Sequence, residues 1–398
     1  MKNEPTMTNE GYLDGVRALL PALRERASLT EQTRRLPDAT VDEFRRAGLL
    51  RALQPARWGG GELEPRTFYR AVMEVGAVCP SSAWVLGVIG VHDWQLALFP
   101  EQAQVDVWGR DPSVQASSSY APTGKVERVP NGFRLRGRWS FSSGCDLCQW
   151  VILGGVAPSD EGMPDMRSFL VPRTDYRIDD TWHVAGLSGT GSKDIVVDGA
   201  FVPEHRTHRF LDAFQLANPG QTLNDGPLYR LPFACVFAYV LAAPAIGAAE
   251  GALEVYRTQT RGRRTAYEAA RVAEDAFAQV RLAEAAARID AARDRLLATF
   301  DEMMSLARAN QEIPLERRTR ARWDAANAVK WSVEAVDLLF AASGGRAIFL
   351  DNPIQRFFRD VHAMRAHALN NPDKAARTFA RADLGVPPDP NAPTDLFV

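Results

Sequence analysis

The sequence TAYEAARVAEDAFAQVRLAEAAARIDAARDRLLATFDEMMSLARANQEI, residues 265–313, contains neither glycine nor proline. Pro314 ends this stretch, and residues 315–343 are again free of both until Gly344-Gly345. Glycine and proline are the residues least compatible with a helix interior. The two stretches therefore predict two long helices, which in an enzyme typically pack as a bundle, often across a subunit interface.

An uncharged segment of 19 residues, 231–249, lies just upstream and approaches the length of a membrane span. It contains Pro232, Pro244, Gly247 and many alanines, and its helical spacing continues into Glu250. This pattern favours a buried helix in the core of a helical domain over a membrane span.

Short apolar runs replace the helical pattern in residues 114–205. The runs are Val151-Ile152-Leu153, Phe169-Leu170-Val171 and Ile195-Val196-Val197, and Asn131-Gly132 has the composition of a hairpin turn. We expect a small antiparallel sheet or barrel here. Apolar residues in residues 10–104 recur at helical spacing.

The predicted fold class is therefore α+β, mainly α, with three domains in order. Residues 1–113 form an N-terminal helical domain, residues 114–225 a central β domain, and residues 226–398 a C-terminal helical bundle. No G-x-G-x-x-G, Walker-type or G-x-S-x-G motif is present, which disfavours a Rossmann dehydrogenase and a serine hydrolase of the elbow type.

Charge and composition limit the kinds of partner that the protein is expected to bind. The formal net charge is -2, so there is no electrostatic case for nucleic acid or an anionic membrane. The N-terminal residues are polar, and we expect a cytoplasmic protein. Cys145 and Cys148 form a C-x-x-C pair, but a tetrahedral metal site needs four ligands and Cys79 and Cys235 are isolated, so no metal is predicted.

Two histidines are candidates for chemistry. His92 lies between the apolar run 85–91 and Trp94, and is either a core histidine bonded to a carbonyl or a general base in a closed pocket. His367 follows Arg359-Asp360, on what the pattern predicts to be a C-terminal helix, and its spacing from His362 puts the two rings on different faces.

Two serine-rich stretches, residues 117–122 and 139–144, place hydroxyls beside an aromatic residue at predicted strand ends. Such groups suit a planar heteroaromatic ligand, which an aromatic can stack on while hydroxyls meet ring nitrogens. Turn-rich β structure explains the serines equally well, because serine is common in turns.

Taken together, the layout and Leu53-Gln54-Pro55 with Trp58-Gly59-Gly60 resemble the acyl-CoA dehydrogenase fold. More narrowly, the chain resembles the two-component flavin-dependent monooxygenases built on that fold, such as the 4-hydroxyphenylacetate and secosteroid hydroxylases. The resemblance is carried by residues 91–94, 117–122, 139–144, 189–192 and 353–367. Where acyl-CoA dehydrogenases have a glutamate base in a Tyr-Glu-Gly-Thr segment, this chain has His367-Ala368-Leu369-Asn370.

The resemblance implies an oxygenase component that uses reduced flavin (FADH2 or FMNH2) and O2, through a C4a-hydroperoxyflavin, to hydroxylate an aromatic substrate such as a polycyclic phenol or an indole. It also implies a separate NAD(P)H:flavin reductase and a homotetramer. The alternatives are an acyl-CoA dehydrogenase-like flavin dehydrogenase or oxidase, and a non-catalytic binding protein that keeps the fold.

Roles for single residues follow from the same resemblance. His92 would help deprotonate the substrate, Ser143 would hydrogen-bond near flavin N5, and His367 would sit over the flavin. Arg263, placed at the start of the long helix, would bind flavin phosphate from a neighbouring subunit, with Arg261 and Arg264 as competitors. The remaining flavin-binding residues would be Ser118, Ser119, Tyr120, Trp139, Ser142, Thr190 and Ser192.

Overall fold

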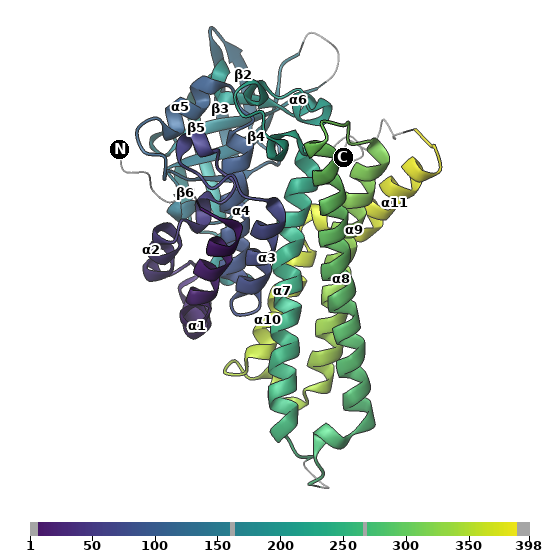
Figure 1. The fold of residues 1–398 in the computed structure, drawn as a ribbon. Coiled ribbons are helices and arrows are strands. Elements are labelled where there is room, and N and C mark those ends of the chain that lie inside the picture. The colour runs from purple at the N-terminus through teal and green to yellow at the C-terminus, as the bar shows by residue number, and fades with distance from the viewer. Residues whose placement is uncertain (1–6, 160–163, 266–268, 388–398) are drawn as a thin grey trace.

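The computed structural model describes residues 7–159, 164–265 and 269–387 (Figure 1). Within these residues the predicted order of helices, strands and helices is confirmed. The domain boundaries at 113/114 and 225/226 stay a prediction, and the outer ends of the first and last domains lie outside the described residues. The N-terminal helices are α1 (Asn9–Thr33), α2 (Asp38–Arg46), α3 (Pro65–Gly76), α4 (Pro80–Leu96) and α5 (Glu101–Trp108).

Two four-stranded sheets form the central part of the molecule. One has the order β1-β4-β5-β8 and the other β2-β3-β7-β6. The strands are β1 (Ala116–Ser119), β2 (Lys125–Val129), β3 (Gly132–Ser142), β4 (Trp150–Ala157), β5 (Asp165–Pro172), β6 (Arg177–Asp179), β7 (Lys193–Pro203) and β8 (Thr207–Arg209). The predicted β domain is confirmed, with its described strands arranged in two sheets. The expectation of purely antiparallel pairing is wrong, because β1 pairs with β4 in parallel.

Two of the three apolar runs seen in the sequence lie in β4 and β5, which are buried on both faces, and the third lies in β7. Val151 and Leu153 belong to the core shared with the second sheet. Ile152 and Leu170 point to the opposite face and pack with residues of α4 and α5. Because side chains alternate along a strand, a strand covered on both sides is apolar throughout.

The predicted hairpin is confirmed, since β2 and β3 pair antiparallel with Val129 opposite Gly132 and Asn131 adopts a positive φ of 65°. The short α6 (Phe210–Gln215) follows β8 and leads toward the helical bundle.

A bundle of long helices completes the fold (Figure 1). Its members are α7 (Phe233–Gly262), α8 (Ala276–Arg308), α9 (Leu315–Ala342), α10 (Pro353–Arg365) and α11 (Pro372–Asp383). α7 lies between the N-terminal helices and the rest of the bundle, contacting both α3 and α4 and α8 and α9. It crosses α3 closely at Gly247, where a Cβ atom would lie 2.1 Å from the carbonyl oxygen of Met73.

One predicted long helix starts later than expected. Residues 266–268 lie outside the described residues, Val272–Glu274 form a 3-10 turn, and α8 begins only after Asp275. The Asp275 side chain accepts a hydrogen bond from the Ala278 amide, as an N-cap does. The chain must reverse direction between α7 and α8. The first part of the stretch without glycine and proline therefore forms the connection between these two helices.

Among the described residues, one helix, α7, is long and apolar enough to cross a membrane, and 89% of its apolar window is buried inside the protein. The prediction that residues 231–249 form a buried core helix is therefore confirmed.

Candidate functional site

A chain of hydrogen bonds runs from Trp84 on α4 to Leu187 in the loop before β7. The Trp84 Nε1 donates to Ser143 Oγ at 3.1 Å. Ser143 Oγ lies 2.7 Å from Ser192 Oγ, which lies 2.7 Å from Thr190 Oγ1. Thr190 Oγ1 donates to the Leu187 carbonyl oxygen at 2.8 Å. The structure thus brings together three of the predicted site residues, Ser143, Thr190 and Ser192.

The direction of this chain follows from counting protons. A hydroxyl has one proton to donate, and a carbonyl can only accept. Since Thr190 donates to the Leu187 carbonyl, Ser192 must donate to Thr190, and Ser143 must donate to Ser192. Ser143 also accepts from Trp84, which leaves it one free lone pair and no free proton.

His367 lies next to Trp84, with their ring centroids 5.9 Å apart. The Leu369 amide donates to His367 Nδ1 at 3.2 Å. An amide only donates, so Nδ1 carries no proton and the neutral ring bears its proton on Nε2. The His367 residue is exposed to solvent in this chain.

The expected position of His367 on a helix is wrong. α10 ends at Arg365, and His367 instead caps the short turn Ala368–Asn370. Leaving the helix lets the His367 ring reach Trp84.

His92 is the second predicted catalytic histidine, and it is buried on α4 at 2% exposure. Its Nδ1 lies 2.8 Å from the carbonyl oxygen of Ala116 and so carries the proton. Its Nε2 is buried and has no hydrogen-bond partner among the described residues. Burial lowers the pKa of His92 to about 4. The sequence left two alternatives for His92, a core histidine bonded to a carbonyl and a general base in a closed pocket. Each alternative describes one ring nitrogen, since Nδ1 is bonded to a carbonyl and Nε2 offers a free lone pair.

Aromatic side chains surround this histidine. Its ring lies 6.4 Å from that of Tyr120 and 5.9 Å from that of Phe237. Phe233 stacks on Phe237 at 4.3 Å, and Tyr120 meets Phe210, Phe233 and Phe237 edge-on. The Tyr120 hydroxyl donates to the side-chain oxygen of the buried Gln95. We call this group of rings the aromatic cluster (His92, Tyr120, Phe210, Phe233, Phe237).

α4 positions both groups of residues. Trp84 and His92 are eight residues apart on this helix, which corresponds to roughly 12 Å along its axis. Nearly every residue of α4 is buried, and the helix packs against α3, α7 and β1. The linked hydroxyls of Ser143, Ser192 and Thr190, here called the hydroxyl chain, and the aromatic cluster are thus held at a fixed separation by one rigid element.

The loop that carries Thr190 is anchored from the C-terminal bundle. The buried carboxylate of Asp360 on α10 accepts a hydrogen bond from the Leu187 amide at 2.6 Å. The Trp182 Nε1 donates to the Leu187 carbonyl at 3.1 Å. The Arg-Asp motif at residues 359–360 therefore acts on the site through the loop rather than by lying in it.

The other predicted flavin-binding residues are more dispersed. Ser142 Oγ donates to Ser117 Oγ, and Ser119 Oγ donates to the carbonyl of Ser140, so both join β1 to β3. Ser118 is half-buried on β1, opposite Ile152 of β4. Trp139 is fully buried in the core between the two sheets, and its Nε1 donates to the Gly154 carbonyl.

Arg263 lies elsewhere, and its expected place at the start of a long helix is wrong. It follows the last residue of α7, and its guanidinium donates to the carbonyl of Ala342 at the end of α9 at 2.6 Å. Its role as a phosphate ligand stays a prediction.

The sequence reasoning missed two aromatic residues beside the hydroxyl chain. Phe141 is 70% exposed, has a positive φ of 68°, and meets Trp182 edge-on at 5.9 Å. A bulky residue with positive φ is rare and is often found at functional sites. Nothing in the sequence signals a positive φ at a phenylalanine, and Trp182 had no motif around it.

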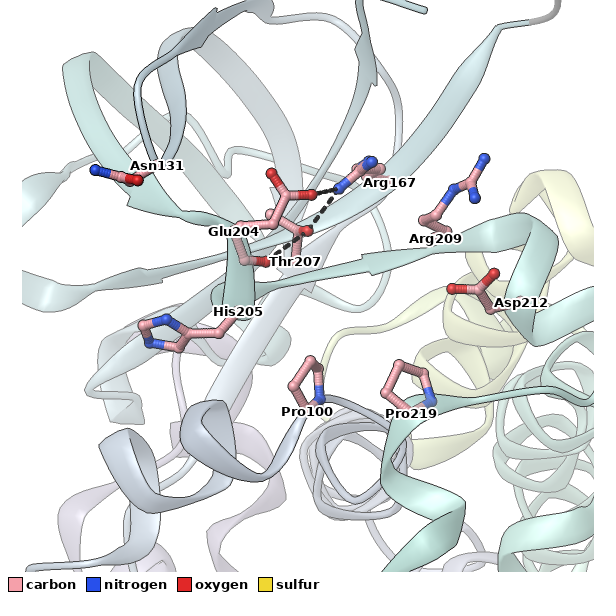
Figure 2. A pocket seen from close by; sticks show the side chains of 9 residues that line it. All are labelled: Pro100, Asn131, Arg167, Glu204, His205, Thr207, Arg209, Asp212 and Pro219. Atoms are coloured by element: carbon pink, nitrogen blue, oxygen red, sulfur yellow. Dashed lines mark hydrogen bonds and ion pairs between the residues drawn. The ribbon is translucent and has the colours of Figure 1, made fainter. Parts of the chain in front are cut away.

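A surface pocket of about 550 Å³ is not this site (Figure 2). None of the predicted site residues lines it, and its charged groups pair with neighbours, as Arg167 does with Asp165 and Glu204. The hydroxyl chain and the aromatic cluster therefore remain the candidate site.

Comparisons with known proteins show the fold class of this chain and the enzyme family to which it belongs. A family model described as the acyl-CoA dehydrogenase C-terminal domain matches residues 239–372. The oxygenase subunit HsaA of a flavin-dependent monooxygenase from Rhodococcus jostii is 43% identical over 371 residues, covering 93% of this chain and 97% of that protein. The FADH(2)-dependent resorcinol hydroxylase oxygenase component of Rhizobium is 36% identical over 398 residues, covering 97% and 96%.

The crystal structure of the HsaA monooxygenase from M. tuberculosis superposes with a TM-score of 0.93 at 41% identity, covering 98% of this chain and 100% of that one. The fold is thus that of the acyl-CoA dehydrogenases, as predicted. The chain belongs to the flavin-dependent monooxygenases of this fold, as an oxygenase component.

Proposed function

We propose that this protein uses reduced flavin and O2 to hydroxylate an aromatic substrate that carries an acidic O–H or N–H, such as a polycyclic phenol or an indole. The observation that carries the proposal is the buried, unpartnered Nε2 of His92 within a cluster of aromatic rings. A buried acceptor without a partner is unfavourable, so it is expected to serve a ligand.

The residues present fit a flavin. Ser143 offers one acceptor to a ring N–H, His367 offers an Nε2–H, and the exposed Phe141 offers a face on which a planar ring can pack. When bound, reduced flavin supplies the reaction of O2 that no protein side chain can perform.

The chain's own residues bind and orient the substrate. The aromatic cluster accepts a flat apolar ring, and His92 Nε2 accepts a hydrogen bond from the substrate O–H or N–H, which makes the ring more electron-rich. The alternative function, that of an acyl-CoA dehydrogenase, lacks support because residues 366–371 contain no carboxylate to remove an α-proton.

We infer the remaining associations from the same relatives. The names of these relatives as oxygenase subunits or components imply a separate reductase component, and we propose an NAD(P)H:flavin reductase. We also propose a homotetramer in the cytoplasm. Exposed apolar side chains in the loop before α10 support an assembled state, namely Ile348, Phe349 and Leu350.

The test supplies chemically reduced FAD to the protein in air with a panel of resorcinol, 4-hydroxyphenylacetate, indole-3-acetate and a phenolic secosteroid. We expect a hydroxylated product from at least one compound. Formation of H2O2 alone from every compound, at the rate of free reduced flavin, would count against the proposal.

A further inference from the structure

The hydroxyl chain has a fixed direction, and this direction has a consequence for the flavin. Ser143 has already given its proton to Ser192 and can only accept from a ligand. Reduced flavin carries a hydrogen on N5 and donates there, whereas oxidised flavin has only a lone pair on N5 and must accept. We propose that Thr190 and Ser192, by fixing the direction of the Ser143 hydroxyl, make the site select reduced over oxidised flavin.

This inference rests on the proposed function, in that it takes Ser143 to face flavin N5. The matched pair is an N5–H donor and the free lone pair of Ser143. To bond oxidised flavin, Ser143 would have to turn its proton away from Ser192 and break a hydrogen bond 2.7 Å long. One neutral hydrogen bond of this kind corresponds to a change of about fivefold in affinity.

The Leu187 carbonyl fixes the end of the chain firmly. It accepts from the Thr190 hydroxyl, from the Thr190 amide at 3.1 Å and from Trp182 Nε1 at 3.1 Å. The Leu187 amide is in turn held by the buried Asp360. The Thr190 carbonyl accepts from the Gly144 amide at 2.9 Å, so the backbone next to Ser143 is tied to the same loop.

Thr190→Val is the sharpest variant. It removes the hydroxyl with little change in shape, and the Leu187 carbonyl keeps its other two donors. Ser192 can then donate to Ser143, which frees the Ser143 proton for oxidised flavin. Ser192→Ala frees the same proton by a different route and serves as a second variant if the first does not fold. Thr190→Ser keeps the hydroxyl and is the matched control.

The experiment measures the dissociation constants of FAD and of dithionite-reduced FAD without O2 or substrate, with FMN in parallel. We expect Thr190→Val and Ser192→Ala to bind the oxidised flavin about fivefold more tightly than the native protein, with the reduced form within about twofold. Thr190→Ser should keep the native ratio. Ser143→Ala should instead lose affinity for the reduced form.

The inference is overturned if Thr190→Val and Ser192→Ala weaken both forms in proportion, or leave both unchanged, while the native protein binds reduced flavin. If the native protein binds no reduced flavin at all, the proposed function fails, and the inference fails with it.

Discussion

His92 and His367 are held as opposite tautomers. His92 donates from Nδ1 to the Ala116 carbonyl and is left with an acceptor at Nε2, whereas His367 accepts at Nδ1 from the Leu369 amide and is left with a donor at Nε2. Backbone groups, not side chains, decide both states. The two histidines therefore suit different tasks, with His92 accepting a hydrogen bond from a substrate and His367 donating one to a ligand.

The first prediction concerns His92. His92→Asn keeps a donor in position for the Ala116 carbonyl but removes the acceptor at Nε2, and His92→Gln can restore an acceptor there. We expect His92→Asn to slow hydroxylation about 10²-fold while reduced-flavin affinity is kept, with partial recovery in His92→Gln. Steady-state product formation and anaerobic flavin binding measure the two effects. Equal loss of both in His92→Asn would assign His92 a structural role.

The second prediction concerns coupling at Ser143. Ser143→Ala removes the acceptor that we propose meets the flavin, so most of the O2 consumed should appear as H2O2 rather than as product. The ratio of H2O2 to hydroxylated product measures this directly. Ser305→Ala, an exposed serine on α8, is the control and should keep the native ratio. An unchanged ratio in Ser143→Ala would remove Ser143 from the mechanism.

The third prediction concerns the aromatic cluster. Phe237→Ala removes a buried ring that stacks on Phe233, so stability should fall by about 3 kcal/mol and the KM for the aromatic substrate should rise. Phe340→Ala removes one ring of another stacked pair, Phe340 with Phe358, outside the site. It should lower stability with an unchanged KM. A rise in KM of the same size in both variants would show that the cluster does not bind substrate.

The fourth prediction concerns pH and Asp360. Burial raises the pKa of Asp360 from 3.8 to about 6. Between these values the native state holds a proton that the unfolded chain has released, so raising the pH through this window lowers the free energy of unfolding, by about 3 kcal/mol. The amide side chain in Asp360→Asn does not titrate in this pH range. Compared with the native protein, it should therefore gain in relative stability as the pH rises from 4 to 7.

Thermal unfolding at several pH values tests this. A constant difference in midpoint between Asp360→Asn and the native protein over that range would show that the carboxyl group does not titrate in this window.

Much of the architecture could be predicted because it depends on local pattern. The strands β4 and β5 contain unbroken apolar runs, and the Asn131-Gly132 turn predicted the hairpin of β2 and β3. The start of α8 could not be found, because no glycine or proline separates it from the connection after α7. The start of α8 is set by the reversal of the chain after α7. For the same reason Arg263 was expected at the start of a long helix, although it follows the end of α7.

The site shows a similar division. Ser143, Thr190 and Ser192 were placed in one site by the family resemblance, and the structure brings their hydroxyls together. The serines at 117–119 could not all face one ligand, because neighbouring side chains on a strand point to opposite faces. Trp84 was missed since α4 is buried nearly all round, so its pattern marks no functional face.

The most direct test of the account supplies chemically reduced FAD and heavy-oxygen-labelled O2 to the protein with the aromatic panel, and reads the label in the product by mass spectrometry. We predict one labelled oxygen atom in each molecule of hydroxylated product, and its loss in His92→Asn. Product oxygen derived from water, or dehydrogenation of an acyl-CoA thioester in place of any hydroxylation, would contradict the assignment of this chain as an aromatic hydroxylase.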